Sequence, residues 1–297
     1  MQVNIGGQPY TFSKDVLAQK NTRDGYFKLA KAIFGLRLEQ WHALGFWDQT
    51  FAPYVLYDGD TAVSSVAVCV NQVLWQNTSK CYVQISTVMT LPEYRNKGLN
   101  RWLMEYVLNE WKENCSGIYL LANDTVVGFY PKFGFEEFTE YDFTVSVKKR
   151  KGEFRKLDLS LSDDVSLIVR NYRLANPFPF AALKVNNISQ FLFHCFHFHQ
   201  DDIFYHEQAN AVVILGQEEG EWVCYDILTD FCGPLDNILG ALVKESTEHV
   251  RLGFTPAATV HCFAAPSKEA DNHLFVFAEK ENIFKDHKVL FPLFSRA

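Results

Sequence analysis

The chain has 297 residues, of which 48% are hydrophobic and 26 are Phe, and its formal net charge is -7. This length is on the order of two domains with ample core material, and the acidic balance disfavours nucleic acid or an anionic membrane as the main partner. Seven cysteines without a C-x-x-C pair, and a first segment with neither a basic flank nor an apolar core, predict a cytoplasmic protein with reduced thiols. The uncharged segment 61–79 carries Ser, Asn and Gln throughout, which favours strands over a membrane span.

The first predicted elements are a helix and a set of antiparallel strands. From Tyr26 to Trp41 apolar residues recur every three or four positions, the period of an amphipathic helix. Two extended runs, 54–57 and 62–70, flank Asp58-Gly59-Asp60, which is a strong hairpin signal. A short run at 73–75 and a long strand over 82–90 follow. This order indicates a mixed α/β sheet.

A tight turn containing a glycine follows the long strand. Residues 88–101 read Val-Met-Thr-Leu-Pro-Glu-Tyr-Arg-Asn-Lys-Gly-Leu-Asn-Arg, and a helix is predicted over 99–113. The backbone N–H groups from Asn96 to Asn100 would be the unpaired donors of a helix N-terminus, which suits a diphosphate. A side chain at Gly98 would hold such a ligand away from the backbone. A glycine at a helix start is also a common structural feature, so this turn alone does not establish a phosphate site, and the neighbouring motifs are needed.

A second motif lies about one helix further along the chain. Residues 120–135 read LLANDTVVGFYPKFGF, after a strand predicted over 118–122. Together the two segments resemble the GNAT superfamily of N-acetyltransferases, over roughly residues 20 to 145. Arg95, Lys97 and Gly98 match the acetyl-CoA loop pattern Arg/Gln-x-x-Gly-x-Gly/Ala, whereas Asn100 departs from its last position. The resemblance implies a GNAT mixed sheet flanked by helices, with acetyl-CoA as cosubstrate.

The resemblance also implies roles for particular residues. Tyr130 is similar to the phenol that protonates the leaving CoA thiolate, although a Tyr packed in the core is the alternative. The backbone of the strand end is expected to pair with the pantetheine arm of CoA. Asn123 is expected to bond the CoA arm or a water, to cap the following short helix, or both. The residues expected to contact acetyl-CoA are Val88, Met89, Thr90, Arg95, Asn96, Lys97, Gly98, Leu99, Asn100, Arg101 and Asn123.

The general base that deprotonates the acceptor amine is not singled out by any spacing. The candidates in segments that could border the substrate cleft are Glu39, His42, Asp48 and Glu140. An aromatic group in the same region fits either the core or a wall of the substrate cleft. Its members are Trp41, Phe46, Trp47 and Phe51.

A basic segment at 148–151 predicts a solvated linker over 148–156, between a GNAT domain over 1–147 and a second domain over 157–297. The second half repeats the order of the first, with extended runs at 210–216 and 222–227, a helix after Gly233-Pro234 and a strand at 250–254. It lacks the Arg-x-x-Gly loop, and Asp230 and Asp236 would repel a diphosphate. We therefore expect a degenerate GNAT-like α/β domain without a cofactor site. An unrelated α+β domain is the alternative.

Two further segments carry hypotheses. The cluster His194, Cys195, His197, His199, with His206 and Glu207 nearby, favours a strand whose row of His faces outward or toward the domain interface, and no metal site. The apolar run 289–294 predicts a docked strand that carries Ala297 toward a domain interface. Some tandem GNAT enzymes use their terminal carboxylate at the active site, so the resemblance suggests Ala297 as a base or amine anchor. A plain strand end is the alternative.

The leading functional hypothesis is an acetyl-CoA-dependent N-acetyltransferase that acts on a primary amine of a small molecule or peptide. The alternative is a catalytically weak acyl-CoA-binding sensor or scaffold module. Tyr130 favours the enzyme. The tandem arrangement resembles the two-GNAT core of the enhanced intracellular survival family. We expect no nucleic-acid or membrane partner, and a homo-oligomer is compatible with the sequence.

Overall fold

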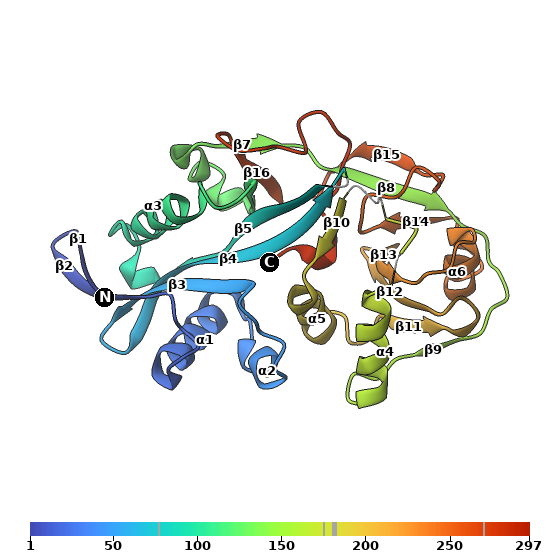
Figure 1. Ribbon diagram of the computed structural model, residues 1–297, viewed down its shortest axis with the longest axis horizontal. Helices are drawn as coiled ribbons and strands as arrows, with labels where there is room; N and C mark the ends of the chain where they lie inside the picture. The colour runs from blue at the N-terminus through green and yellow to red at the C-terminus, as the bar shows by residue number, and fades with distance from the viewer. Residues whose placement is uncertain (77, 175, 180–182, 270) are drawn as a thin grey trace.

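The computed structural model describes residues 1–76, 78–174, 176–179, 183–269 and 271–297, and it places two sheets side by side in an elongated molecule (Figure 1). The strands are β1 (Gln2–Ile5), β2 (Gln8–Ser13), β3 (Phe51–Asp58), β4 (Thr61–Trp75), β5 (Thr78–Thr90), β6 (Gly117–Ala122), β7 (Phe135–Phe138), β8 (Tyr141–Ser146), β9 (Phe154–Lys156), β10 (Leu183–Asn186), β11 (Ile203–His206), β12 (Ala211–Glu218), β13 (Glu221–Leu228), β14 (His249–Leu252), β15 (Phe263–Pro266) and β16 (His273–Phe277). The helices are α1 (Lys20–Phe34), α2 (Leu38–Ala43), α3 (Leu99–Trp111), α4 (Ser162–Tyr172), α5 (Ile188–His197) and α6 (Leu235–Leu242), with 3-10 turns η1 (Pro92–Tyr94), η2 (Asp124–Val126), η3 (Tyr130–Phe133), η4 (Glu207–Ala209) and η5 (Leu293–Ser295). None of the helices in these ranges is long and apolar enough to cross a membrane.

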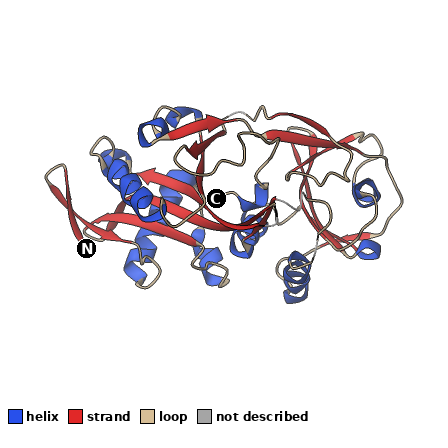
Figure 2. Ribbon diagram, turned by 45° about the horizontal axis from the view of Figure 1, so that its top comes forward, coloured by secondary structure: helices blue, strands red, loops and turns tan. Residues whose placement is uncertain are grey.

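The first sheet runs in the order β1-β2-β3-β4-β5-β6-β16-β7, and β10 extends it along the far end of β4. Its described strands pair antiparallel except for β5 and β6, which are parallel. Helix α3 packs its apolar side, including Leu103 and Val107, on one face. Helices α1 and α2 cover the other face, and α5 joins them there through Phe193 (Figures 1 and 2). This sheet is therefore a helix-covered α/β layer, as expected.

The second sheet runs in the order β15-β8-β14-β13-β12-β11-β9, and β13 and β14 are its parallel pair. Helix α6 buries Ile238 and Leu239 on one face, while α4 and α5 bury Ile168 and Phe191 on the other. The strands, turn and helix predicted for the second half are confirmed as β12, β13, α6 and β14.

The two sheets share one topology and exchange a strand. In the first, three antiparallel strands (β3, β4, β5) lead through α3 into the parallel β6; in the second, β11, β12 and β13 lead through α6 into β14. The next position beside β6 is taken by β16 from the second half of the chain, and the position beside β14 by β8 from the first half. The expected boundary at 148–156 therefore does not separate the sheets, because each sheet is completed by a strand from across it.

The segment expected to be a solvated linker is held by the second sheet. Residues 154–156 form β9, which pairs with β11. The Lys149 ammonium donates to the carbonyls of Ala241 and Val243 at the end of α6, and Arg150 forms an ion pair with Asp236 at 2.5 Å. Most of this segment is exposed, as expected of a solvated linker, but its cations satisfy carbonyl and carboxylate groups of α6 and so fasten it to the second sheet.

Two local predictions also change. The helix expected over 26–41 is divided into α1 and α2, because Gly35 adopts φ +70° and ends α1 with a left-handed cap. The runs at 62–70 and 73–75 are one continuous strand, β4, which pairs with β5 along most of its length. The hairpin at Asp58-Gly59-Asp60 and the helix after Gly98 are confirmed, although α3 ends at Trp111.

Candidate active site

The parallel strands of the first sheet separate in the middle of β5. Pairing between β5 and β6 covers only Tyr82–Ile85 opposite Gly117–Leu120. Beyond Ile85, β5 keeps β4 as its partner, and the register shifts so that Ser86 pairs with Ala67 but Met89 with Ser65. Thr87 lies in this bulge with φ +39°. The side of β5 that faces away from β4 is therefore open along Val88, Met89 and Thr90, the segment expected to pair with the pantetheine arm.

The loop after β5 presents a row of backbone donors. Asn96 (φ +63°) and Gly98 (φ +81°) both adopt the left-handed conformation, and Gly98 is the N-cap of α3. Within the described ranges, the backbone N–H groups of residues 96 to 101 have no protein acceptor. A Cβ at Gly98 would meet only the Ile5 side chain, at 3.9 Å, so the loop backbone is open on this side. Free N–H groups at a helix N-terminus are suited to phosphate.

Basic side chains surround this loop. Arg95, Lys97 and Arg101 are exposed, and the Arg95 guanidinium donates to the Thr90 carbonyl at 3.4 Å. The Lys97 ammonium lies over the ring of Tyr94, 4.4 Å from its centroid. The acidic chain therefore has a local cationic site where the diphosphate is expected.

Asn100, which departs from the GNAT loop pattern, joins the loop to the sheet. Its carboxamide oxygen accepts from the Ser64 hydroxyl at 2.7 Å, and the Ser64 hydroxyl also contacts the Thr90 hydroxyl at 2.9 Å. Leu99 is buried in the core below α3. These contacts fix the start of α3 against β4 and β5. Asn100, although it departs from the GNAT loop pattern, therefore anchors the loop to the sheet.

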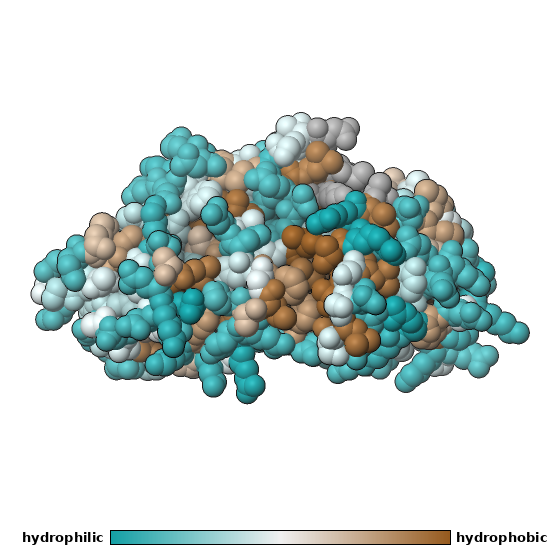
Figure 3. All heavy atoms as spheres, turned by 60° about the horizontal axis from the view of Figure 1, so that its bottom comes forward, coloured by the Kyte–Doolittle hydropathy of each residue, from teal (hydrophilic) through white to brown (hydrophobic). Residues whose placement is uncertain are grey.

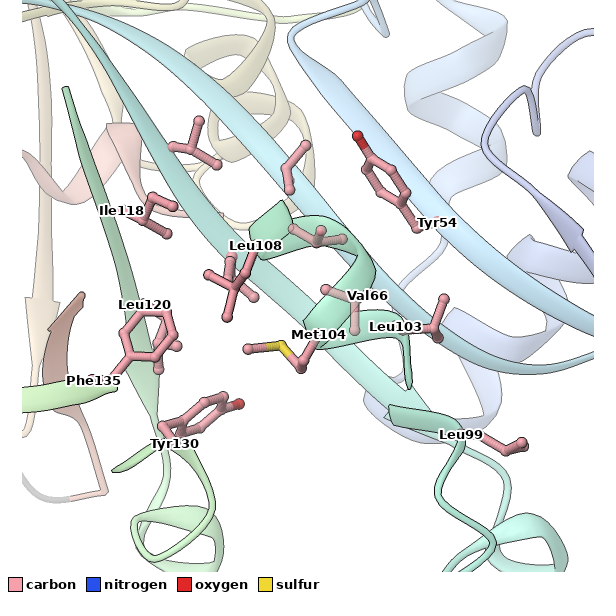
Figure 4. Close-up of a cluster of buried hydrophobic side chains, with 14 of the residues drawn as sticks. Tyr54, Val66, Leu99, Leu103, Met104, Leu108, Ile118, Leu120, Tyr130 and Phe135 are labelled. Atoms are coloured by element: carbon pink, nitrogen blue, oxygen red, sulfur yellow. The ribbon is translucent and has the colours of Figure 1, made fainter. Parts of the chain in front are cut away.

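Tyr130 begins η3 and is 5% exposed, among Leu120, Met104 and Phe135 (Figure 4). Its hydroxyl points away from Leu120 and Phe135, toward the side of the cluster where Met104 lies, and has no hydrogen-bond partner in the described chain. Burial raises the pKa of Tyr130 to about 12, so the phenol carries its proton throughout the neutral range. A buried phenol without a partner is suited to donate to a ligand atom.

Asn123 follows β6 and caps the short turn η2. Its carboxamide oxygen accepts from the Thr125 hydroxyl at 2.6 Å and from the Thr125 backbone N–H at 3.2 Å. The capping interpretation is therefore confirmed. The side chain is exposed, and its amide nitrogen is left for a ligand or water.

The candidate bases lie in different environments. Glu140 is buried and bonds the Arg296 guanidinium at 2.8 Å and the Phe291 backbone N–H at 2.9 Å; burial raises the pKa of Glu140, and Arg296 opposes that shift. Asp48 accepts from the backbone and hydroxyl of Thr50. Glu39 and His42 lie on α2, and burial lowers the pKa of His42. No two of the four are brought together by these contacts.

The aromatic group near α2 belongs to the core. Trp41 and Trp47 stack with centroids 4.8 Å apart, and both pack against Phe51. All three are nearly inaccessible, and Phe46 packs beside them against Phe196 of α5. The core interpretation is confirmed for this group.

The His cluster is helical rather than extended. His194 and His197 lie in the last turns of α5, and His199 follows the helix and pairs with Asp202 at 3.0 Å. The strand prediction is wrong because the alternating Phe residues pack as a helix between the two sheets. Within the described residues, no three His, Cys, Asp or Glu side chains are grouped closely enough to hold a metal ion.

The chain after 288 is docked but forms no strand. Residues 289–291 are buried in an extended segment, and η5 follows. The Arg296 carbonyl accepts from His194 Nε2 at 2.6 Å and from the Gln190 side chain. Ala297 then makes two hydrogen bonds with the carboxamide of Gln84: its N–H donates to Oε1 at 2.8 Å, and its backbone oxygen accepts from Nε2 at 3.0 Å. This segment lies against the middle of β5, between the two sheets (Figure 1).

Sequence reasoning missed Gln84 and the bulge at Thr87. Gln84 lies two residues before the separation of β5 and β6, and its partner Ala297 is 213 positions away. The hydroxyl of Thr87 contacts the Tyr26 hydroxyl of α1 at 3.3 Å. An isolated Gln in a strand gives no sequence signal, and Thr is not a residue type that favours positive φ.

The sequence and fold of this chain are similar to those of known acetyltransferases. Residues 17–138 match the family model described as an acetyltransferase (GNAT) domain. This part of the chain belongs to the GNAT acetyltransferases. A probable N-acyltransferase from Enterococcus faecalis is 18% identical, with a TM-score of 0.58 over 90% of this chain and 72% of that chain. GCN5-related N-acetyltransferases from Kribbella flavida and Anabaena variabilis are 15% and 14% identical, with TM-scores of 0.53 and 0.54; both matches cover 90% of this chain, and 70% and 72% of those chains.

These likenesses extend the GNAT fold beyond the matched domain, because they cover both sheets. The chain therefore contains a GNAT acetyltransferase domain over residues 17–138, a kind of domain that uses acetyl-CoA as the acyl donor and requires an acceptor substrate.

Proposed function

We propose that this GNAT protein transfers acetyl from acetyl-CoA to a primary amine of a small molecule or peptide, with Tyr130 as the general acid. The observation that carries the proposal is the separation of β5 and β6 beside a buried phenol that has no hydrogen-bond partner among the described residues. In this reaction the amine attacks the thioester carbonyl, and the C–S bond breaks. The phenol protonates the CoA sulfur, and the attacking nitrogen loses one proton, which returns to the phenolate through solvent.

The cofactor would lie on the α3 side. The free N–H groups of 96–101 and the side chains of Arg95, Lys97 and Arg101 would hold the diphosphate. The open backbone of 88–90 would pair with the pantetheine arm, which leads the thioester toward Tyr130. Asn123 stands at the end of β6 and would bond the same arm.

The acceptor would approach from the other side of the sheet. Gln84 and Ser86 share the register positions of Cys69 and Ala67, which pack with α1, so both point to the α1 and α5 face. The face that carries these helices has an apolar area near its centre with hydrophilic side chains around it (Figure 3). We infer that a monoamine with an apolar part is a better acceptor than a polycation, because the surface of this face is apolar near its centre.

Thiol release from acetyl-CoA, followed with 2-phenylethylamine, spermidine, glucosamine and tetra-alanine, tests the proposal. We expect steady turnover with at least one amine, and 2-phenylethylamine to exceed spermidine. Tight CoA binding without turnover on any of the four would support the acyl-CoA sensor instead.

A further inference from the structure

The buried polar groups around the separation of β5 and β6 are almost all engaged. The Gln84 carboxamide bonds Ala297 and also accepts from the Tyr119 hydroxyl at 3.3 Å. Tyr119 in turn accepts from Asn71 at 3.0 Å. The hydroxyl of Thr87 is in contact with Tyr26. This region therefore uses its own polar side chains for internal bonding.

Like the buried hydroxyl of Ser65 on β4, the Ser86 hydroxyl is an exception in this group. Ser86 is the residue at which β5 leaves β6, and it is 5% exposed, yet its hydroxyl has no hydrogen-bond partner in the described chain. Its cross-strand neighbour on the same face is Ala67, which has no polar atom to offer. An unpaired buried hydroxyl costs on the order of 1 to 3 kcal/mol. A ligand that reaches Ser86 would remove this cost.

The position of Ser86 identifies that ligand group. Tyr130 lies with α3 and β6, the side on which the cofactor loop stands, whereas Ser86 projects to the α1 and α5 face. A thioester held along residues 88–90 would thus have Tyr130 and Ser86 on opposite sides. A hydroxyl on the acceptor side can accept a hydrogen bond from an amine N–H and so direct the nitrogen lone pair toward the carbonyl.

We propose that Ser86 positions the acceptor by accepting a hydrogen bond from its reacting nitrogen, an inference that rests on the proposed acetyl transfer to an amine. Ser86 is a hydrogen-bond acceptor here and not the base, since no charged group is in contact with its hydroxyl in the described chain. Removal of the hydroxyl should impair acceptor binding and leave the fold unchanged, because no internal bond is lost.

The experiment measures binding of two CoA derivatives by calorimetry and needs no turnover. In one, the CoA sulfur carries CH₂–CO–NH–CH₃; in the other, the N–H is replaced by an ester oxygen in CH₂–CO–O–CH₃. The wild-type chain should bind the amide about tenfold more tightly than the ester, and Ser86→Ala should reduce this ratio to about one. Affinity for CoA itself should not change.

Tyr82→Phe is the matched control. It also removes a buried hydroxyl without a partner from β5, but at the paired end of the strand, next to Gly117. This variant should keep the wild-type ratio. Equal affinities of the wild-type chain for amide and ester, or an unchanged ratio in Ser86→Ala, would overturn the role of Ser86. Failure of acetyl transfer would appear separately, as absent thiol release from chains that still discriminate the two derivatives.

Discussion

Two parallel strand pairs of the described residues, β5–β6 and β13–β14, share one topology, but the strands of the first separate and those of the second do not. In the first sheet, β5 and β6 separate after Ile85, and the loop before α3 leaves its backbone free. In the second, Gly253 follows β14 and donates to the Cys224 carbonyl of β13 at 2.8 Å, and a Cβ at Gly253 would overlap the backbone of Tyr225. The Leu293 N–H then bonds the Gly253 carbonyl, so the chain itself fills this position.

The loops before the two helices differ in the same way. Gly98 faces open space, whereas a side chain at Gly233 would overlap the ring of Phe231, which covers the loop backbone. The first loop carries exposed cations; the second has Asp236 in the first turn of its helix, already paired with Arg150. The comparison shows that the second half shares the topology of the first, whereas the backbone of its loop is covered by Phe231 and an acidic side chain stands at the start of its helix. Both features disfavour a phosphate ligand at this loop.

The largest expected effect is the loss of all CoA binding in Gly98→Glu. The carboxylate would occupy the space of the diphosphate, and no second site would remain. Calorimetry should give one CoA per wild-type chain and none for the variant. Gly220→Glu is the control, because Gly220 has a similar φ of +88° with open space around it, in the β12–β13 turn. Two CoA per wild-type chain, or one per Gly98→Glu chain, would contradict the prediction that CoA binds only at the loop before α3.

Tyr130→Phe tests whether the phenol beside the separated strands β5 and β6 protonates the CoA sulfur. The ring and its packing remain, and only the proton donor is lost. We expect kcat to fall by about 10²-fold or more, with CoA affinity nearly unchanged. Because the pKa of Tyr130 is raised to about 12, the wild-type phenol should not titrate near neutrality, and kcat should not fall from its ionisation below pH 9. Full activity of the variant would remove Tyr130 from the mechanism.

Much of the first sheet is visible in the sequence, because its signals are local. The hairpin at Asp58-Gly59-Asp60, the turn at Gly98 and the motif around Tyr130 each depend on neighbouring residues. The pairing of β8 with β14 and of β16 with β6 could not be predicted. Each pair joins residues more than a hundred positions apart, and such pairing leaves no periodic pattern in the sequence. The bulge at Thr87 and the unpaired hydroxyl of Ser86 are products of that tertiary arrangement.

The contact between the two halves should depend on pH through His194 of α5. Burial lowers the pKa of His194 to about 4, and its Nε2 bonds the Arg296 carbonyl beside β5. The unfolded chain, with a His pKa near 6.5, binds more protons between pH 6.5 and 4. This contribution to stability is complete above pH 6.5 and decreases as the pH falls through that window.

Urea unfolding at pH 7 and pH 5 measures the effect. Between these values the wild-type free energy of unfolding should decrease by about 2 kcal/mol more than that of His194→Gln, which keeps a side-chain donor for the Arg296 carbonyl but cannot titrate. Equal decreases in the two proteins would show that His194 does not link the halves in this way.

The smallest expected effect concerns an exposed cation of the first loop, Arg95, and a cation that lies beside the second, Arg150. Arg95→Ala should weaken CoA binding by about tenfold at 0.1 M salt, the scale of one charge-assisted hydrogen bond to a phosphate in partly solvated surroundings. The factor should shrink at 1 M salt, where the Debye length falls to about 3 Å. Arg150→Ala removes the corresponding cation of the second half, which is already neutralised by Asp236, and CoA affinity should not change. If both variants weakened binding equally, net charge rather than the loop at Gly98 would govern CoA recognition, and the contrast between the two strand pairs would lose its electrostatic part.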